Sequence, residues 1–250
     1  MSTRIGQYVL DSLTQSMYED SRIIYREYIQ NAADQIDKAL QTGLIKSPRE
    51  GMINIVIDTV ERNVMIEDNA TGVKGDEIEA VLKNIAKSTK DRTKDKGFRG
   101  IGRLGGLAYC DQLVFETSFA GEPYGYQLIW DAKLHRDVIN NRSTHEDASE
   151  VIDAITRIEH FDEDISKHYF KVKLFNVTDD ALLDVNDISN YLSMVAPVPF
   201  RRNQFKYTSK ISRFLEDNDL TMDEYLIYVN SNIIEKLYTN YIYNGEKGKK

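Results

Sequence analysis

Hydrophobic residues recur at helical spacing along the stretch IIYREYIQNAADQIDKAL. The apolar members of this stripe are Tyr25, Ile29, Ala32, Ile36 and Leu40. A stripe with this period predicts one long amphipathic helix, over about 21–41, that buries one face and stops at Gly43. A shorter helix is expected at about 5–17, before this one.

Alternation of apolar and polar residues predicts a series of strands. They are INIVIDT (53–59), NVMIEDN (63–69), DQLVFETSF (111–119), YGYQLIWD (124–131), SEVIDAITRIEHF (149–161) and HYFKVKLFNV (168–177). We expect the first two to be joined by a short turn around Glu61–Arg62, the next two to form a hairpin around 121–123, and the last two to pair with each other. Further helices are expected at about 75–86, 101–110 and 185–195. Non-adjacent helices among antiparallel hairpins favour an α+β fold, with one mixed sheet and helices on one face.

The segment after Pro197 and Pro199 predicts a change of domain. We expect a first domain over 1–200, and in 201–250 one helix followed by a hairpin, YLIYVNSNIIEKLY, that turns at 230–232. This hairpin is expected to open a following domain, so that the chain would be an N-terminal fragment of a longer protein.

Composition narrows the class of protein. Of 250 residues, 41% are hydrophobic and 29% are charged, which is typical of a globular chain. No apolar run is long enough to cross a membrane, and the N-terminus lacks the apolar core of a signal peptide. Cys110 is the single cysteine and the four histidines show no ligand spacing, which excludes a disulfide framework and predicts no cysteine or histidine metal site. We therefore expect a cytoplasmic protein.

Charge is distributed unevenly. The net charge of −8 argues against a domain that coats nucleic acid or an anionic membrane. Residues 87–103 nevertheless carry seven lysines and arginines against two aspartates, whereas residues 144–164 carry eight acids against one arginine. Both runs are consistent with solvated surface, but the basic run leads directly into a cluster of glycines.

Three segments could carry chemistry. On the long helix, Glu27, Asn31 and Asp34 follow at spacings of four and three and so share one face. A solvated helix face explains the two acids, although asparagine is a poor residue inside a helix. At the end of a predicted strand, Asp68 is followed four residues later by Gly72. A strand-end carboxylate can accept a hydrogen bond from the amino group of a purine, and a glycine lets a flat ring approach the backbone. A simple Asp/Asn turn is the alternative.

The third segment, KGFRGIGRLGG, places Gly97, Gly100 and Gly102 in the pattern G-x-x-G-x-G before a predicted helix. This is neither the Rossmann order nor a Walker A motif. Free backbone N–H groups at the start of a helix, with Lys94, Lys96 and Arg99 nearby, suit an anion such as a phosphate. A flexible loop with close helix packing is the alternative.

Taken together and in this order, the three segments resemble the GHKL ATPase superfamily, which includes gyrase B subunits, the ninety-kilodalton heat-shock chaperones, histidine kinases and mismatch-repair MutL proteins. The motif Glu27-x-x-x-Asn31-x-x-Asp34, its continuation NAADQIDK and NIAKS (84–88) are most similar to the chaperones, whereas GFRG (97–100) is similar to MutL. The resemblance covers about residues 5–200. It implies a Bergerat-type two-layer α/β sandwich with ATP between the helices and a lid.

The resemblance also implies roles for individual residues. Glu27 would be the catalytic general base, Asn31 would hold Mg²⁺ through its side-chain oxygen, and Asp34 would support the nucleotide. Asp68 would accept from the adenine amino group, with Gly72 and Val73 lining the base pocket. The phosphate cradle and lid hinge would comprise Gly97, Phe98, Arg99, Gly100, Ile101 and Gly102, and Lys87 is a candidate lid contact.

The sequence departs from the family pattern at three points. Ala70 replaces the first glycine of D-x-G-x-G, Tyr169–Phe170 stands where a Gly-Thr precedes a strand, and the lid loop at about 89–96 is short.

The resemblance predicts an ATPase that uses Mg²⁺, closes its lid, and drives a chaperone-like switch with ATP-dependent homodimerisation and an unidentified protein client. Two alternatives stay open: a nucleotide-sensing module with negligible turnover of its own, and the ATPase head of a DNA-processing clamp like MutL or gyrase. The acidic net charge does not indicate nucleic acid as a partner, and no membrane partner is expected.

Overall fold

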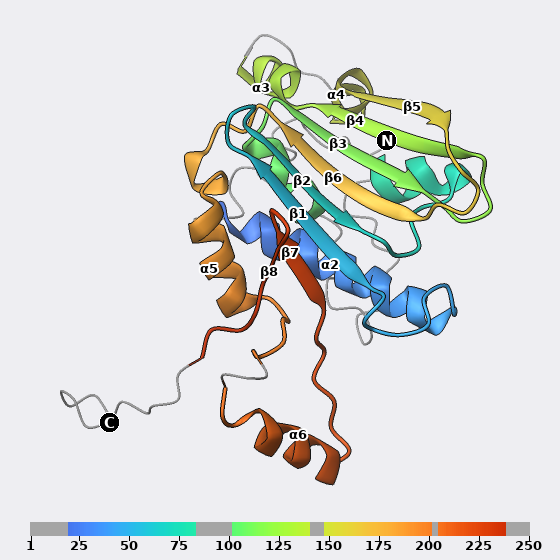
Figure 1. Cartoon of the computed structure of the whole chain (residues 1–250). Helices are drawn as coiled ribbons and strands as arrows, with labels where there is room; N and C mark the ends of the chain where they lie inside the picture. Colours follow the sequence, from blue (N-terminus) through green and yellow to red (C-terminus); the bar gives the residue numbers. More distant parts are fainter. Residues whose placement is uncertain (1–19, 84–101, 141–147, 202–204, 239–250) are drawn as a thin grey trace, which may run out of the picture.

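The protein is described by a computed structural model that covers residues 20–83, 102–140, 148–201 and 205–238. An eight-stranded mixed sheet, in the order β5-β4-β3-β6-β2-β1-β7-β8, forms one layer (Figure 1). The strands are β1 (Met52–Asp58), β2 (Asn63–Asp68), β3 (Gln112–Ser118), β4 (Tyr124–Asp131), β5 (Thr156–Asp162), β6 (Tyr169–Phe175), β7 (Leu226–Val229) and β8 (Asn232–Ile233). All pairs are antiparallel except β1 with β7.

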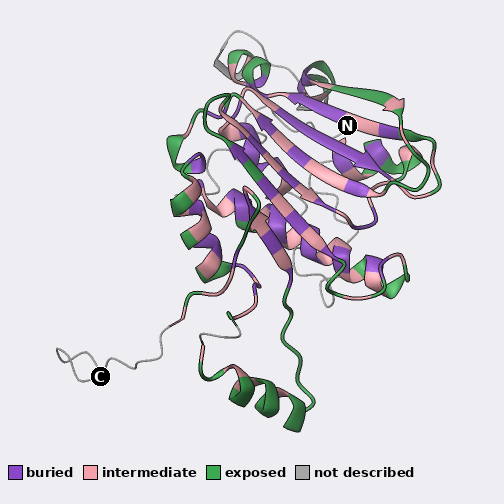
Figure 2. Ribbon diagram, in the orientation of Figure 1, coloured by how far each residue is buried: buried purple, intermediate pink, exposed green. Residues whose placement is uncertain are grey.

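One face of the sheet carries most of the core. The alternation of side chains and the strand register place the same three sets of residues on this face. They are Ile53, Ile55 and Ile57 of β1, Val64, Ile66 and Asp68 of β2, and Leu113, Phe115 and Thr117 of β3. The helix α2 (Ile23–Gln41) packs against this face through a buried apolar stripe, as its sequence period predicted. Figure 2 shows the buried residues concentrated between sheet and helix. The predicted α+β fold, with a mostly antiparallel mixed sheet, is confirmed.

Several predicted elements form where the sequence placed them. The β1–β2 turn contains Arg62, which has a left-handed φ of 53°, and the β3–β4 turn contains Gly121, with a φ of 94°. The helix α5 (Val185–Val195) begins after Asp184, whose carboxylate accepts from the N–H groups of Asn186 and Asp187 as an N-cap.

Other elements differ from the prediction. Residues 149–161 are not one strand, because α4 (Ala148–Ile155) precedes β5, and Val151 and Ile155 of α4 are buried one helical turn apart. β5 and β6 do not pair with each other: β5 pairs with β4 at the sheet edge, whereas β6 lies between β3 and β2. The helix α3 (Ala132–Asn140) was not anticipated.

The two short helices around the glycine segment are also irregular. The expected helix at 75–86 is a 3₁₀ turn, η1 (Gly75–Glu77), followed by a π-helix, η2 (Glu79–Lys83), up to the last described residue of that segment. The helix expected at 101–110 is a 3₁₀ helix, η3 (Gly102–Ala108). No helix among the described residues is long and apolar enough to cross a membrane.

The C-terminal hairpin lies in the same sheet as the strands that precede residue 200. β7 pairs in parallel with β1, and its turn at Asn230 and Ser231 takes left-handed φ values of 44° and 67°. The hairpin therefore extends the sheet, where the sequence predicted the start of a following domain. Between α5 and β7 the chain makes an excursion that carries α6 (Thr208–Asp217). The boundary at residue 200 and the existence of a further domain stay predictions.

Candidate functional site

The helix α2 presents Glu27, Asn31 and Asp34 along one side, as their spacing predicted. None of the three is fully exposed: each is half-buried. The side of α2 that carries them is thus covered in part by neighbouring segments, which a purely solvated helix face would not require. Side-chain oxygen atoms held on one rigid helix are suited to positioning water and a metal ion that is bound to phosphate.

The glycine segment meets α2 at Glu27. Gly102 begins η3, and a Cβ atom at this position would collide with Oε2 of Glu27. A larger residue at this position would require the end of the Glu27 side chain to move away. Tyr28, the next residue on α2, fixes the contact: its hydroxyl donates to the carbonyl oxygen of Arg103 at 3.0 Å and accepts from the N–H of Gly106 at 3.0 Å.

Asp68 ends β2 on the sheet face that α2 covers. The residue is 4% exposed, and the only hydrogen bond that its side-chain carboxylate accepts among the described residues comes from the N–H of Ala70, at 3.0 Å. Burial raises the pKa of the Asp68 carboxyl to about 7, and the bond from Ala70 offsets only part of that effect. A buried carboxyl with so few partners retains acceptor capacity that a ligand can use.

The loop after Asp68 has a conformation that requires glycine. Gly72 has a φ of +67°, and a Cβ atom there would overlap the carbonyl oxygen of Ser118. The next residue, Val73, is half-buried and donates its N–H to the hydroxyl of Thr117 at 2.8 Å. The loop is therefore held directly against the end of β3.

Four residues that organise this region were not identified from the sequence. Gln35 on α2 accepts from the hydroxyl of Thr71 at 2.9 Å, and His168 lies with Nδ1 2.8 Å from the carbonyl oxygen of Ala70. Thr117 is fully buried, and its hydroxyl donates to the carbonyl oxygen of Tyr169 at 3.0 Å. Thr117 could have been found, because a threonine follows Leu113 and Phe115 on the core face, where an apolar residue is expected. The other three depend on contacts between distant segments.

The remaining predicted site residues, Lys87, Gly97, Phe98, Arg99, Gly100 and Ile101, lie outside the described residues. Among the residues that are described, no group of three histidine, cysteine, aspartate or glutamate side chains could hold a metal ion. A magnesium ion here would need few protein ligands, and this suits an ion that binds through phosphate oxygens and retained waters. The side-chain oxygen of Asn31 is a donor of the required type.

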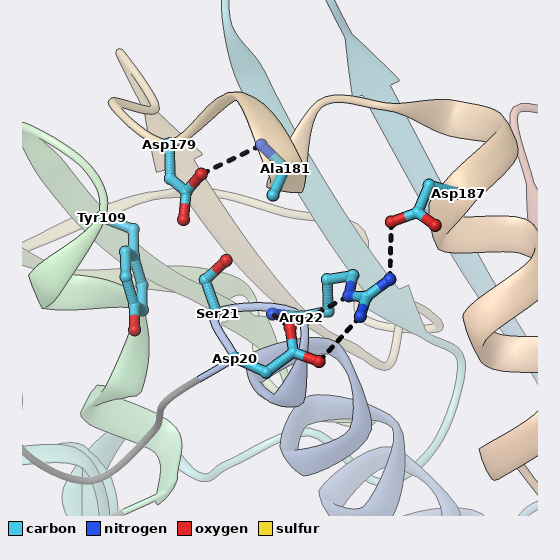
Figure 3. Close-up of a pocket in the computed structure, with 7 residues that line it drawn as sticks. All are labelled: Asp20, Ser21, Arg22, Tyr109, Asp179, Ala181 and Asp187. Atoms are coloured by element: carbon cyan, nitrogen blue, oxygen red, sulfur yellow. Dashed lines mark hydrogen bonds and ion pairs between the residues drawn. The ribbon is translucent and has the colours of Figure 1, made fainter.

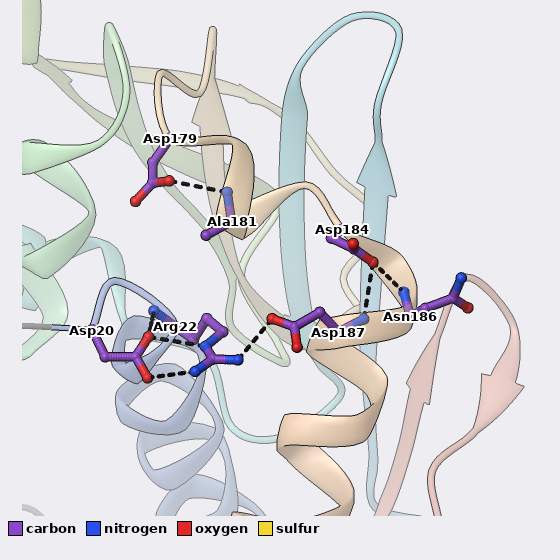
Figure 4. Close-up of polar contacts among 7 residues, drawn as sticks. All are labelled: Asp20, Arg22, Asp179, Ala181, Asp184, Asn186 and Asp187. Carbon is purple, nitrogen blue, oxygen red and sulfur yellow. Dashed lines mark hydrogen bonds and ion pairs between the residues drawn. The ribbon is translucent and has the colours of Figure 1, made fainter.

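A separate pocket of about 650 Å³ lies at the start of α2 (Figure 3). Its lining comprises Asp20, Ser21, Arg22, Tyr109, Asp179, Ala181 and Asp187. Arg22 pairs with Asp20 at 2.9 Å and with Asp187 at 2.7 Å, and so joins the start of α2 to α5 (Figure 4). The hydrogen bond from Arg22 holds the pKa of the Asp20 carboxyl below its usual value. None of the sequence-predicted site residues lines this pocket, and the ion pair of Arg22 with Asp187 links the start of α2 to α5.

Comparison with known proteins identifies the family of the chain. A model of the family described as histidine kinase-, DNA gyrase B-, and HSP90-like ATPase matches residues 22–162. Two curated proteins named chaperone protein HtpG, from Burkholderia ambifaria and Burkholderia cenocepacia, are each 31% identical over 141 residues, a match that covers 50% of this chain and 22% of theirs. The matched region contains α2, Asp68 and η3. The chain belongs to the family of histidine kinase-, DNA gyrase B- and HSP90-like ATPases.

Proposed function

We propose that this chain binds ATP with Mg²⁺ and hydrolyses it to ADP and phosphate. The observation that carries the proposal is the approach of the Gly102 backbone to the carboxylate of Glu27, on the side of α2 that also holds Asn31 and Asp34. This brings a helix-opening glycine, which favours phosphate, next to a carboxylate that can orient water.

The base would bind at Asp68. The carboxyl group lies on the sheet face that α2 covers, and its acceptor capacity fits the amino group of adenine, whereas guanine presents a carbonyl at that position. Gly72 and Val73 line the approach, because the left-handed turn at Gly72 brings the backbone against β3. The purine would therefore contact backbone atoms on one side and the Asp68 carboxyl at its edge.

At the phosphate end, Glu27 would accept a proton from, and orient, the attacking water. Asn31 would hold Mg²⁺ through its side-chain oxygen. Mg²⁺ in this place would neutralise charge that develops on the phosphates. Asp34, one turn further along α2, would support the nucleotide through water. Gly97, Phe98, Arg99, Gly100, Ile101 and Lys87 would complete the cradle and lid.

Lid closure, ATP-dependent homodimerisation and action on a protein client are proposed by relation to HtpG. The match spans 22% of the length of those relatives. A second candidate, a nucleotide sensor with negligible turnover, is favoured by Phe170, which lies opposite Asp68 in the β2–β6 register where the family pattern has a polar partner for the base.

The test is single-turnover hydrolysis by the wild type and by Glu27→Ala, with ATP affinity measured in parallel. Loss of the general base is expected to slow hydrolysis by about 10²-fold or more while the Kd for ATP changes little. Arg26→Ala, an exposed neighbour on α2, is the matched control and should retain the wild-type rate. Equal hydrolysis by the wild type and Glu27→Ala would remove Glu27 from the mechanism. Tight binding without turnover by the wild type would favour the sensor.

A further inference from the structure

The strand β5 forms one edge of the eight-stranded sheet (Figure 1). Its inner side pairs with β4 along all seven of its residues. Among the described residues, no strand pairs with its outer side and no further backbone hydrogen bond reaches it. The strand at the opposite edge, β8, has only two residues. Alternate N–H and C=O groups of β5 therefore face outward and can pair with a further strand.

The side chains of β5 are also accessible, since most of them are exposed on both faces of the strand (Figure 2). Ile158 is 40% exposed although it is apolar, and it lies outside the buried core cluster. Arg157 and Glu159 flank it on the opposite face and pair with each other at 2.8 Å. Charges on an edge strand discourage pairing with most partners. They do not discourage a strand that sets an opposite charge against each of them.

A second copy of the same strand has this property. We propose that β5 is a self-association edge, which pairs antiparallel with β5 of a second copy of this chain about a twofold axis through Ile158, normal to the sheet. This axis keeps both sheets facing the same way, so residues directly opposite each other share a face. The two Ile158 side chains then meet on one face. On the other face, each Arg157 lies opposite the Glu159 of the second copy.

Charge favours this register over its neighbours. If the axis passed through Arg157 or Glu159, that residue would lie opposite its own copy, and like charges directly opposite each other are destabilising. With the axis at Ile158, the ion pairs of the two copies lie side by side, and each charge has an opposite charge both along and across the strands. Thr156 then lies opposite His160, which adds no like-charge contact. An unrelated strand would need a base and an acid at the same two positions, whereas a second copy supplies them by symmetry.

The strength of this contact follows from its size. The overlap between the copies, residues 156–160 on each strand, buries far less than the roughly 800 Å² per partner of a standard interface. The pairing is therefore expected to be weak and reversible, and to be stronger at low salt because it depends on exposed charges. None of the residues proposed to bind ATP lies on β5, so the pairing requires no nucleotide and is independent of the proposed function.

Charge reversal tests the register, with sedimentation equilibrium of the nucleotide-free chain at low and high salt as the measurement. We expect the wild type to dimerise with a Kd of roughly tens to hundreds of micromolar, more tightly at low salt. Arg157→Glu sets two acids opposite each other, and Glu159→Arg sets two bases opposite each other, so each variant should dimerise about tenfold more weakly. A mixture of the two should recover the wild-type affinity as a heterodimer, because every opposite pair is then complementary.

A matched control separates this pairing from a general effect of charge. Arg213→Glu makes the same change of charge at an exposed position on α6 and should dimerise like the wild type.

Disulfide trapping tests the position of the axis. In this register the two copies of residue 158 lie directly opposite each other, with Cβ atoms about 4.5–5.5 Å apart, so Ile158→Cys should form a disulfide-linked dimer under mild oxidation. Asp162→Cys is the control, because it is equally part of the exposed strand but lies roughly 26 Å from its own copy. The native Cys110 is buried and should not react.

Three results would each overturn the proposal. One is a wild type that stays monomeric at about millimolar concentration in low salt, since even the weakest expected pairing would be populated there. The second is a mixture of the two charge variants that associates no better than either alone. The third is cross-linking of Ile158→Cys that is no faster than that of Asp162→Cys.

Discussion

Asp68 is the residue proposed to recognise the nucleotide base, and burial of its carboxyl group is unfavourable. A carboxyl that is 4% exposed, with one backbone N–H as its described partner, is poorly solvated in its charged form. The pKa of the Asp68 carboxyl is raised to about 7 because its charged form is poorly solvated. Such sites are commonly functional, because a ligand supplies the interactions that the empty protein lacks.

The raised pKa makes stability depend on pH in a predictable direction. The folded chain holds the Asp68 proton more tightly than the unfolded chain, whose carboxyl titrates near its ordinary value of 3.8. The stabilising contribution of the protonated form is therefore complete below about pH 4 and is lost as the pH rises through about 7. Asp68→Asn removes the titration but keeps an oxygen that can accept from Ala70.

Urea unfolding of the wild type and Asp68→Asn between pH 5 and pH 8 checks this. The free energy of unfolding of the wild type should fall relative to that of the variant by on the order of 2–4 kcal/mol over this range. Parallel pH profiles for the two proteins would show that Asp68 does not titrate as its burial implies.

At the scale of elements, α2 is the helix around which the site is built. It contacts η3 through Tyr28, the loop after β2 through Gln35, and the segment before β7 through Asp37, which accepts from the hydroxyl of Tyr225 at 2.7 Å. The contact with η3 differs from the others because it also brings Gly102 to Glu27. Loosening η3 should therefore affect both stability and the phosphate end of the site.

Tyr28→Phe tests this coupling, and Tyr25→Phe is its matched control. Tyr28→Phe leaves the buried N–H of Gly106 without its partner and should reduce the free energy of unfolding by about 1–3 kcal/mol. It should also weaken ATP binding, since η3 is no longer held against α2. Tyr25→Phe loses a hydrogen bond of 2.7 Å to the carbonyl oxygen of Leu182 and should lower stability without changing the Kd for ATP. If Tyr28→Phe leaves the ATP affinity unchanged, η3 does not form the phosphate end.

The elements that periodicity predicts well are those whose pattern is strong over many residues, such as α2 and the alternating strands β1 and β3. The failures lie where local pattern is ambiguous. In residues 149–161, Val151, Ile152 and Ile155 fit a helix as well as a strand, and the strand begins only at Thr156. The β1–β2 and β3–β4 pairs form as predicted, but the pairing of β5 with β6 was predicted wrongly, because pairing depends on burial along the whole sheet. β6 buries Val172 and Leu174 and takes a central place, whereas the charged β5 remains at the edge.

Across the whole molecule, the sequence indicated the order of the motifs but not how they meet. The contact of Gly102 with Glu27 joins residues far apart in the chain, and the same holds for Thr71 with Gln35. Local pattern could not predict the position of the C-terminal hairpin either, because β7 pairs with β1, a strand far away in the sequence. These contacts form when the sheet packs over α2, and no single segment of the sequence predicts that packing.

Isothermal titration calorimetry tests most directly whether this chain binds ATP through Asp68. ATP and GTP, each with MgCl₂, would be titrated at pH 8 into the wild type, Asp68→Asn and Asp137→Asn, an exposed control on α3. We expect the wild type and Asp137→Asn to bind ATP and strongly reject GTP. Asp68→Asn should bind ATP about 10²-fold or more weakly, as the loss of a buried polar acceptor implies. Equal affinity of the wild type and Asp68→Asn for ATP, or equal affinity of the wild type for ATP and GTP, would contradict binding through Asp68.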